Sequence, residues 1–418
     1  MGGDAARLTG VAERRSFLLL QGPVGAFFRR LAAKLQARGH RVTRVNFNGG
    51  DLVQGPRSGA VCFRAPSEAW SQAVTELAER HGVGDLVLFG DCRPRHRIAI
   101  RALQPLGVRV HVLEEGYFRP DWITCERDGV NGNSRLPRDP AFYLDAVHRM
   151  GNRGRESTAV GPSVAGLIRA TTGYYAGAAL LAPLFPRHRS HRPSSPWREL
   201  GWWLRRAPGL RSRRRIAAAR QTALLASGRP YFVLALQLDA DSQIRRHSGF
   251  SGMSEVIAFA VRSFARSAPG DATLVVKNHP LDCGRTDFER VVAQQAAAAG
   301  IGPRTLYLDG GDLPALLDHA LGLVVVNSTS GLSGLHRGLP TVVLGRALYD
   351  IAGLTHDAGG AHDDRLDHFW RAPEPPDGEL YRAFRRVVME RTQINGGFYT
   401  ERGLALAVPG TIERLEAA

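Results

Sequence analysis

Short, continuous apolar runs recur along the 418-residue chain, and each run ends in a polar or glycine-rich turn. The clearest are SFLLL, DLVLF, VRVHVL, YFVLALQL and GLVVV, and segments with apolar residues at helical spacing separate them. Continuous apolar runs are typical of strands buried on both faces, and their alternation with helices is typical of parallel sheets. The pattern therefore predicts an α/β protein. Because the alternation starts again near Tyr231, we expect two Rossmann-like domains.

These signals also suggest domain limits. We expect residues 1–185 to form the first Rossmann-like domain and residues 229–390 the second, with both facing a central cleft. Residues 186–228 have the composition of a basic linker rich in arginine and tryptophan. We expect residues 391–418 to form a C-terminal segment that packs back across the domains.

Charge and cysteine content restrict the partners and the compartment. Lysine and arginine number 55 against 39 acidic residues, a formal charge of +16, which favours a polyanionic partner. The four cysteines show neither zinc-site spacing nor a disulfide framework, as expected for a reducing cytoplasm. The first residues lack the apolar core of a signal peptide, and no apolar run approaches the length of about 18 residues needed to cross a bilayer. We therefore expect a cytoplasmic protein without a membrane span.

Two adjacent carboxylates, Glu114 and Glu115, follow the apolar run VRVHVL directly. Open α/β sheets bind their ligands where the carboxyl ends of strands open into loops. Acids at that position can differ in pKa because of burial and a like-charged neighbour, and they are candidates for catalysis. The alternative is a structural pair that caps a helix or forms an ion pair with an arginine.

Polar turns follow three other strand signals of the first domain, and they should face the same ligand as the glutamates. Amide groups together with an acid suit a ligand rich in hydroxyls, which needs many directional hydrogen bonds. The candidate residues for this sugar or acceptor side are Gln21 and Gly22 in QGPVG, Asn46, Asn48 and Asp51 in NFNGGD, and Asp91 and Arg93 in FGDCRPRHR. A surface loop with an Asp-Arg pair is the alternative for the last of these.

In the second domain, the strand signal TLVVKNHP ends with Lys277, His279 and Pro280. Residues two apart on an extended backbone point to the same side, so Lys277 and His279 should project together. The proline ends the strand and fixes the turn. A cation and an imidazole at that point can bind phosphate oxygens or protonate a departing oxygen. A purely structural histidine at a strand end is the alternative.

A second strand of this domain runs into a turn rich in hydroxyl groups. Its polar residues are Asn327, Ser328, Thr329 and Ser330. One serine is explained by capping of the helix that follows, whereas the whole set is typical of a phosphate cradle. The lysine of a P-loop is missing, so a nucleotide with a single phosphate fits better than a triphosphate.

The stretch from Arg187 to Arg215 has ten arginines against one acidic residue, with Trp197, Trp202 and Trp203 among them. Basic segments that carry tryptophan suit the plane of an anionic bilayer interface. Single-stranded nucleic acid also suits arginines that alternate with aromatic residues. A solvated linker whose tryptophans pack on a domain is the third interpretation. We predict the membrane surface, and no nucleic-acid partner.

Together these motifs resemble one family, the capsule polysaccharide biosynthesis proteins of the KpsS/LipB type. The resemblance covers most of the chain and rests on LQGPVGAFFRRLA, RVNFNGGD, LFGDCRPRHR, EEGYFRPDWIT, GVNGNS, VKNHP, NSTSGL and TQINGGFYT. The chain is also similar to bacterial sialyltransferases that share an acid-acid-Gly motif, an HP motif and a serine motif. Glu114 to Gly116, His279 with Pro280, and Ser328 to Ser330 match these motifs.

The family resemblance implies a GT-B fold and a retaining β-Kdo glycosyltransferase. It further implies CMP-Kdo as donor, phosphatidylglycerol at the inner membrane as acceptor, and other capsule assembly proteins as partners. Glu115 is the first candidate and Glu114 the second for a nucleophile or for the base that acts on the acceptor. We expect Arg119 to pair with the carboxylate of Kdo, and we expect neither a metal nor another cofactor. The alternatives are another GT-B enzyme with a different sugar nucleotide, and a basic binding module without enzymatic activity.

Overall fold

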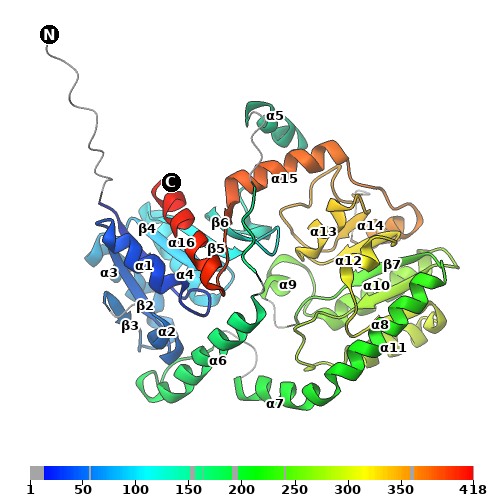
Figure 1. Cartoon of the computed structure of the whole chain (residues 1–418), viewed down its shortest axis with the longest axis horizontal. Coiled ribbons are helices and arrows are strands. Elements are labelled where there is room, and N and C mark those ends of the chain that lie inside the picture. Colours follow the sequence, from blue (N-terminus) through cyan, green and yellow to red (C-terminus); the bar gives the residue numbers. More distant parts are fainter. Residues whose placement is uncertain are drawn as a thin grey trace, which may run out of the picture. The chain divides into compact units, whose positions relative to one another are not determined.

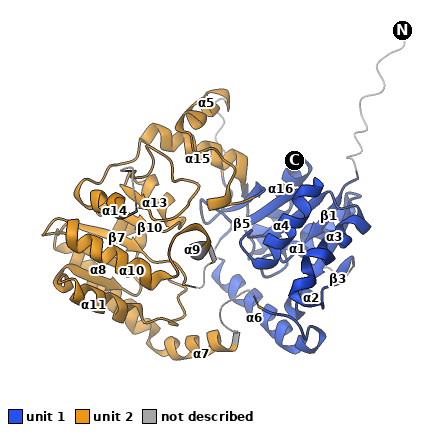
Figure 2. Cartoon of the chain, turned by 180° about the vertical axis from the view of Figure 1, so that it is seen from behind, with its two compact units in different colours: residues 1–128, 157–189, 394–418 blue, residues 129–156, 190–393 orange. Residues whose placement is uncertain are grey.

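The computed structural model describes residues 14–55, 58–150, 156–161, 163–190, 196–239, 242–357 and 362–417. The chain divides into two compact units, which Figure 2 shows in different colours. Unit 1 consists of residues 1–128, 157–189 and 394–418, and unit 2 of residues 129–156 and 190–393. Residues 129–156, which we expected in the first domain, are thus grouped with the second, and the C-terminal segment is grouped with the first.

Unit 1 is built around a seven-stranded sheet with the order β12-β6-β5-β4-β1-β2-β3. Neighbouring strands from β3 to β5 pair in parallel, and β6 pairs with β5 in antiparallel register. The strands are β1 (Ser16–Leu19), β2 (Arg41–Asn46), β3 (Ala60–Cys62), β4 (Asp85–Phe89), β5 (Arg109–Glu115), β6 (Trp122–Arg127) and β12 (Gln393–Asn395). The predicted α/β class with a parallel sheet is confirmed for this unit.

Unit 1 also contains helices, several of which lie on the two faces of its sheet (Figure 1). They are α1 (Phe27–Ala37), α2 (Gly49–Gln54), α3 (Trp70–His81), α4 (Pro94–Leu103), α6 (Val164–Leu180) and α16 (Glu401–Glu416). Apolar residues of α1 and α16 share one core with Phe17, Leu19, Val87 and Leu113 of the sheet. Right-handed crossovers place α4 on the opposite face, because β4 to β5 and β1 to β2 run in opposite directions across the sheet. The C-terminal helix therefore packs back onto unit 1.

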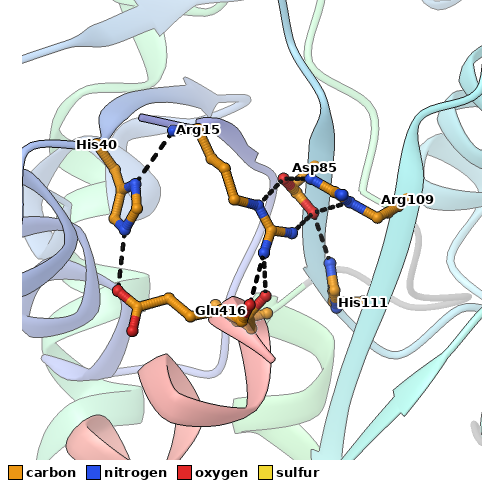
Figure 3. Close-up of polar contacts among 7 residues, drawn as sticks. Arg15, His40, Asp85, Arg109, His111 and Glu416 are labelled. Carbon is orange, nitrogen blue, oxygen red and sulfur yellow. Dashed lines mark hydrogen bonds and ion pairs between the residues drawn. The ribbon is translucent and has the colours of Figure 1, made fainter. Parts of the chain in front are cut away.

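A buried charge cluster connects α16 to the amino-terminal edge of the sheet (Figure 3). Asp85, whose side chain is fully buried, accepts hydrogen bonds from Arg15, from Arg109 at 2.8 Å and from His111 at 2.9 Å. Arg15 also donates to the Leu415 carbonyl at 2.6 Å. Burial alone would raise the pKa of Asp85, but the hydrogen bonds from His111, Arg109 and Arg15 outweigh it and lower the pKa far below its ordinary value.

Unit 2 has a five-stranded sheet with the order β11-β10-β7-β8-β9, and all its pairs are parallel. Its strands are β7 (Tyr231–Ala235), β8 (Thr273–Lys277), β9 (Thr305–Leu308), β10 (Gly322–Val325) and β11 (Thr341–Val343). Read from the first strand outwards, this is the same order as β3-β2-β1-β4-β5 of unit 1. Two Rossmann-like units are therefore present, as the repeated alternation in the sequence predicts.

Unit 2 also contains helices, several of which lie around this sheet (Figure 1). They are α5 (Pro140–Met150), α7 (Pro196–Arg206), α8 (Leu210–Ala226), α9 (Ser242–His247), α10 (Met253–Ser267), α11 (Phe288–Ala298), α12 (Leu313–Leu317), α13 (Ser330–His336), α14 (His362–Arg371) and α15 (Gly378–Thr392). The main core lies between the sheet and α10, α11 and α14, with Phe232, Phe264 and Trp370 at its centre.

The segment expected to be a linker is folded within unit 2. From residue 196 onwards it forms α7 and α8, whereas residues 191–195 of the Arg/Trp stretch lie outside the described residues. Gln221 of α8 donates to the Asp312 carbonyl at 3.0 Å and accepts from the Asp312 amide at 2.8 Å. Ala217 and Leu224 are buried, so packing and hydrogen bonds hold α8 in place in a segment that we expected to be a basic linker. No helix among the described residues is long and apolar enough to cross a membrane.

Candidate functional site

The strand order puts a topological switch point in each sheet. The chain leaves β1 in one direction and β4 in the other, and the same reversal separates β7 from β10. Ligands of open α/β sheets bind at such points, outside the carboxyl ends of the strands. The candidate residues of each unit follow strands at this edge of their own sheet.

Glu114 and Glu115 are the last two residues of β5, and both are half-buried. Because side chains alternate along a strand, they point to opposite faces of the sheet. Glu115 shares its face with Leu113, which packs against α1 and α16. Glu114 points towards Gly90 after β4, where its Oε2 lies 3.5 Å from the position that a Cβ on Gly90 would occupy. The two adjacent acids therefore have different neighbours.

Tyr399, from the motif TQINGGFYT, is the polar partner of Glu115. Its phenol donates a hydrogen bond to the Glu115 carboxylate. Burial, together with the charge of Glu115 and this hydrogen bond, raises the pKa of Tyr399, so the phenol keeps its proton. Arg119 is close enough to lower that pKa, and its Nε donates to the Gly116 carbonyl at 3.3 Å. The arrangement orients a carboxylate that remains accessible from the strand end.

The candidate residues near the switch point of unit 1 form a closed hydrogen-bond network. Gln21 donates to the Asp51 carboxylate at 3.1 Å and to the Tyr174 hydroxyl at 2.6 Å, and Asn48 donates to the same hydroxyl at 2.7 Å. Tyr174 in turn donates to Asp51 at 3.1 Å, and Arg93 donates to Gln21 Oε1 at 3.1 Å. These groups satisfy one another, so the network holds α6 against α2 and positions the loops around it.

Three other candidates in unit 1, Asn46, Asp91 and Gly22, are buried. Asn46 is fully buried, and neither atom of its amide has a hydrogen-bond partner among the described residues. Asp91 is also buried and accepts from Cys92 Sγ at 3.2 Å. Gly22 leaves room for Phe28, because a Cβ there would lie 2.7 Å from the Phe28 ring. These three residues shape the turns after β1, β2 and β4.

In unit 2, β8 ends at Lys277, two residues earlier than the sequence suggests. The Lys277 side chain is only 6 % exposed. Burial lowers the pKa of Lys277, and the nearby carboxylates of Asp312 and Asp309 oppose this shift. The positive charge of Lys277 is therefore balanced within the unit. His279 lies beyond the strand, so strand alternation does not place the two side chains on one side.

A polar network fixes the turn that carries His279. Asn278 accepts from the His279 amide at 2.8 Å and donates to Asp309 at 3.0 Å and to Asp282 at 3.2 Å. Arg206 of α7 forms an ion pair with Asp309. His279 is half-buried, and its Nδ1 accepts from the Leu281 amide at 3.1 Å. In the neutral ring the proton then lies on Nε2, which makes that atom the donor. Pro280 follows on the surface.

Asn327 occupies the switch point of unit 2 together with Gln237, which follows β7. Gln237 donates to Asn327 Oδ1 at 2.8 Å and accepts from the Asn327 amide at 3.0 Å. The GVNGNS segment reaches the same point, because Asn131 donates to the Asn327 carbonyl at 3.1 Å. This segment is therefore more than a turn: it contacts the loop that carries the candidate serines.

Ser328, Thr329 and Ser330 are half-exposed beside this pair. Ser328 Oγ accepts from the Ser330 amide at 3.2 Å and lies 3.1 Å from Ser330 Oγ. Thr329 precedes α13 and makes no side-chain cap. The Tyr349 hydroxyl donates to the Ser328 carbonyl, and the absence of a side chain at Gly331 leaves space for the Tyr349 ring. Two hydroxyls are thus held together at an accessible turn, which suits a small anion better than the short dipole of α13 alone does.

The family of the chain follows from a comparison with known proteins. The family model described as "Capsule polysaccharide biosynthesis protein" matches residues 84–399, about three quarters of the sequence. The chain belongs to this family.

Two relatives match the chain over nearly its whole length. It is 35% identical over 397 residues to the "Capsule polysaccharide export protein KpsS" of Escherichia coli, which covers 94% of this chain and 99% of the relative. It is 35% identical over 404 residues to the "Capsule polysaccharide modification protein LipB" of Neisseria meningitidis serogroup A, with 92% of each chain covered. The resemblance inferred from the motifs is confirmed at the level of the family.

Among solved structures, the β-Kdo 2,7 transferase KpsC of Thermosulfurimonas dismutans covers 96% of this chain and 99% of its own, at 13% identity and a TM-score of 0.45. Anabaena HepE in complex with UDP and glucose covers 97% of this chain and 100% of its own, at 12% identity and a TM-score of 0.36.

The structure of this capsule family member also reveals polar residues that sequence reasoning missed. They are Tyr174, Gln237, Asn131, Tyr349 and Tyr399. Asn131 and Tyr399 lie in motifs already noted, GVNGNS and TQINGGFYT, and a polar residue inside a recognised motif was the signal available for them. Tyr174 and Tyr349 lie in segments without a polar pattern, so only their contacts identify them.

Proposed function

We propose that this protein is a retaining β-Kdo glycosyltransferase. It transfers Kdo from CMP-Kdo to a lipid acceptor of the phosphatidylglycerol type and so begins the glycolipid end of a bacterial capsular polysaccharide. The observation that carries the proposal is Glu115, accessible at the carboxyl end of β5 and hydrogen-bonded by Tyr399, in a chain that belongs to a capsule polysaccharide biosynthesis family. Residues of unit 2 supply complementary groups for a nucleotide phosphate.

In this proposal the turn of Ser328 and Ser330 binds the phosphate of the donor. Both hydroxyls are half-exposed and close together, and hydroxyls can donate to phosphate oxygens. His279 donates from Nε2 to the departing oxygen of CMP. Lys277 contributes less directly, because Asp309 and Asp312 already balance its charge. CMP leaves with one phosphate, so the chemistry does not demand a divalent metal clamp.

Retention follows from two inversions at the anomeric carbon. The Glu115 carboxylate attacks that carbon, the bond to the CMP oxygen breaks, and CMP leaves as its phosphate anion while the Nε2–H of His279 donates a hydrogen bond to the leaving oxygen. A hydroxyl of the lipid headgroup then attacks the same carbon, the carboxylate leaves, and a base takes the hydroxyl proton. Glu114 is the second candidate for the nucleophile, and Arg119 is the proposed partner of the Kdo carboxylate.

A lipid acceptor places the reaction at a membrane. We propose that the protein works on the cytoplasmic face of the inner membrane as a peripheral protein. The charge of +16 supports this location, because the inner surface of such membranes is anionic.

Mass spectrometry of a phosphatidylglycerol analogue tests donor, acceptor and stoichiometry together. The purified protein is incubated with the analogue and CMP-Kdo, and in parallel with UDP-sugars and GDP-sugars. We expect a mass increase by Kdo with CMP-Kdo alone. A mass increase with another nucleotide sugar alone would replace the donor in the proposal, and no product with any donor would refute the transferase function.

A further inference from the structure

Helix α7 presents an apolar stripe to the outside of unit 2. Trp197 is 70% exposed, Leu200 47% and Leu204 66%. Their spacing of three and seven residues places them on one face of the helix. Single exposed apolar residues are ordinary on protein surfaces, but a row along one helix is an unpartnered face.

The opposite face of α7 is attached to the unit. Arg206 is mostly buried and pairs with Asp309 and, at 3.8 Å, with Asp282. The guanidinium of Arg285 lies 5.9 Å from the ring centre of Trp202. At 100° per residue, Trp202 and Arg206 lie on the side away from the stripe. The stripe is thus exposed because the helix is anchored by its other side.

The sequence that follows Leu200 of the stripe is rich in arginine. No acidic residue occurs between Leu200 and Ala226, a stretch that contains seven arginines. Arg205 of α7 and Arg211 and Arg215 of α8 are exposed. Arginines at this density attract an anionic surface, and the aliphatic side chains need a medium that accepts apolar groups.

We propose that the α7–α8 face, formed by Trp197, Leu200, Leu204, Arg205, Arg211 and Arg215, docks on an anionic lipid bilayer. The tryptophan and leucines enter the boundary between headgroups and acyl chains, while the arginines pair with lipid phosphates. Nucleic acid would satisfy the arginines and the tryptophan, but it offers nothing to Leu200 and Leu204. The inference rests on the proposed function in that a lipid acceptor requires contact with a membrane.

Vesicle flotation of the full-length protein tests the docking without any sugar nucleotide, so its result is independent of transferase activity. We compare phosphatidylcholine vesicles with and without phosphatidylglycerol. We expect binding only with the anionic lipid. The double variant Trp197→Ala/Leu204→Ala and the double variant Arg211→Gln/Arg215→Gln should each reduce partitioning about tenfold or more. High salt should weaken binding, because the Debye length falls to about 3 Å at 1 M.

The matched control is Leu106→Ala/Arg101→Gln, which removes one exposed leucine and one exposed arginine from unit 1 and should bind as the wild type does. Each variant is also assayed with a soluble acceptor analogue, where unchanged transfer separates docking from chemistry. A second measurement does not depend on alanine variants: brominated lipids should quench the wild-type tryptophan emission, and Trp197→Phe should lose most of that quenching.

Three results would overturn the proposal. The first is wild-type binding by both α7–α8 double variants. The second is no binding of the wild type to anionic vesicles. The third is displacement of the protein from vesicles by poly-U at low concentration, which would assign the face to nucleic acid. Loss of transfer in the wild type with docking intact would instead refute the proposed function alone.

Discussion

The two ends of the unit 1 sheet carry charged clusters of opposite character. At the amino-terminal edge, Asp85 is fully buried and has three cationic or imidazole partners (Figure 3). At the carboxyl-terminal edge, Glu115 is half-buried and its described side-chain partner is the phenol of Tyr399. The first carboxylate is compensated from every side, whereas the second keeps a surface for a substrate.

This difference separates stability from chemistry. Removal of a buried carboxylate that has several partners lowers the stability of the fold, but such a carboxylate has no side left for a ligand. A carboxylate with one hydrogen bond and partial exposure is oriented and still reactive. The same strand, β5, contributes Arg109 and His111 to one cluster and Glu115 to the other. Substitutions at the amino-terminal edge should therefore affect the free energy of unfolding, and those at the carboxyl-terminal edge should affect turnover.

The largest expected effect is the loss of transfer in Glu115→Gln. The amide keeps the shape and a hydrogen-bond acceptor for Tyr399 but cannot act as nucleophile or base. We expect turnover to fall by about 10³-fold, with the thermal midpoint within a few degrees of the wild type. Product formation from CMP-Kdo, measured beside thermal unfolding, checks both parts.

Glu114→Gln is the control, because Glu114 lies one residue earlier and points to the other face of the sheet. Its loss of turnover should be smaller. If Glu114→Gln is inactive and Glu115→Gln is active, the two glutamates exchange roles. Full activity in both variants would remove the acid pair from the mechanism.

The next effect is on stability. Asp85→Ala leaves His111 and Arg15 without their shared acceptor in a buried place. We expect the free energy of unfolding to fall by about 3 kcal/mol, while turnover per folded molecule stays unchanged. Urea unfolding and an activity assay at low temperature measure the two quantities. Glu401→Gln is the matched control: its ion pair with Arg30 is exposed, so its loss should cost less than about 1 kcal/mol.

The same cluster predicts how stability depends on pH. Burial lowers the pKa of His111, which outweighs the hydrogen bond to Asp85. The unfolded chain therefore binds a proton near the ordinary value of about 6.5 while the folded protein does not, and stability falls as the pH decreases below that value. The lowered pKa of Asp85 adds a second loss below its ordinary value of 3.8, where the unfolded carboxylate takes up a proton first.

Urea unfolding at a series of pH values measures this dependence. His111→Gln should remove up to about 1.4 kcal/mol per pH unit from the slope just below pH 6.5. The exposed His319→Gln serves as control. His188 and His356 also have a lowered pKa because of burial, so part of the slope should remain. An unchanged slope in His111→Gln would show that the cluster does not control acid stability.

The sequence was sufficient to predict the central strands of both sheets and the residues that follow them, but it did not predict β3, β6 or β12. Apolar runs of four to eight residues are typical of buried strands, and parallel strands have their carboxyl ends at one edge of the sheet. Gln21, Asp51, Glu115, Asn327 and Ser328 accordingly lie at that edge of their sheets. The family motifs pointed to the same positions.

The partners of these residues could not be predicted, because they come from distant parts of the chain. Tyr174 contacts Asp51 across 123 positions, and the Arg15 contact with the Leu415 carbonyl spans 400. Neither pair shares a local pattern. The folding of α7 and α8 within unit 2 could not be predicted for a related reason: the composition of this arginine-rich segment does not reveal that Arg206 forms an ion pair with Asp309.

The smallest expected effect concerns Tyr399, which lies with Glu115 at the carboxyl-terminal edge of the unit 1 sheet. Tyr399→Phe removes the hydrogen bond that orients Glu115, and we expect kcat to fall about tenfold with KM and the thermal midpoint unchanged, because the hydrogen bond matters most when charge moves at the carboxylate. Tyr117→Phe is the matched control, since the Tyr117 hydroxyl donates to buried Glu126 instead. That variant should lower the midpoint and leave kcat intact. If Tyr399→Phe behaves in the same way, Tyr399 belongs to the scaffold and the orientation of Glu115 depends on the backbone of β5 alone.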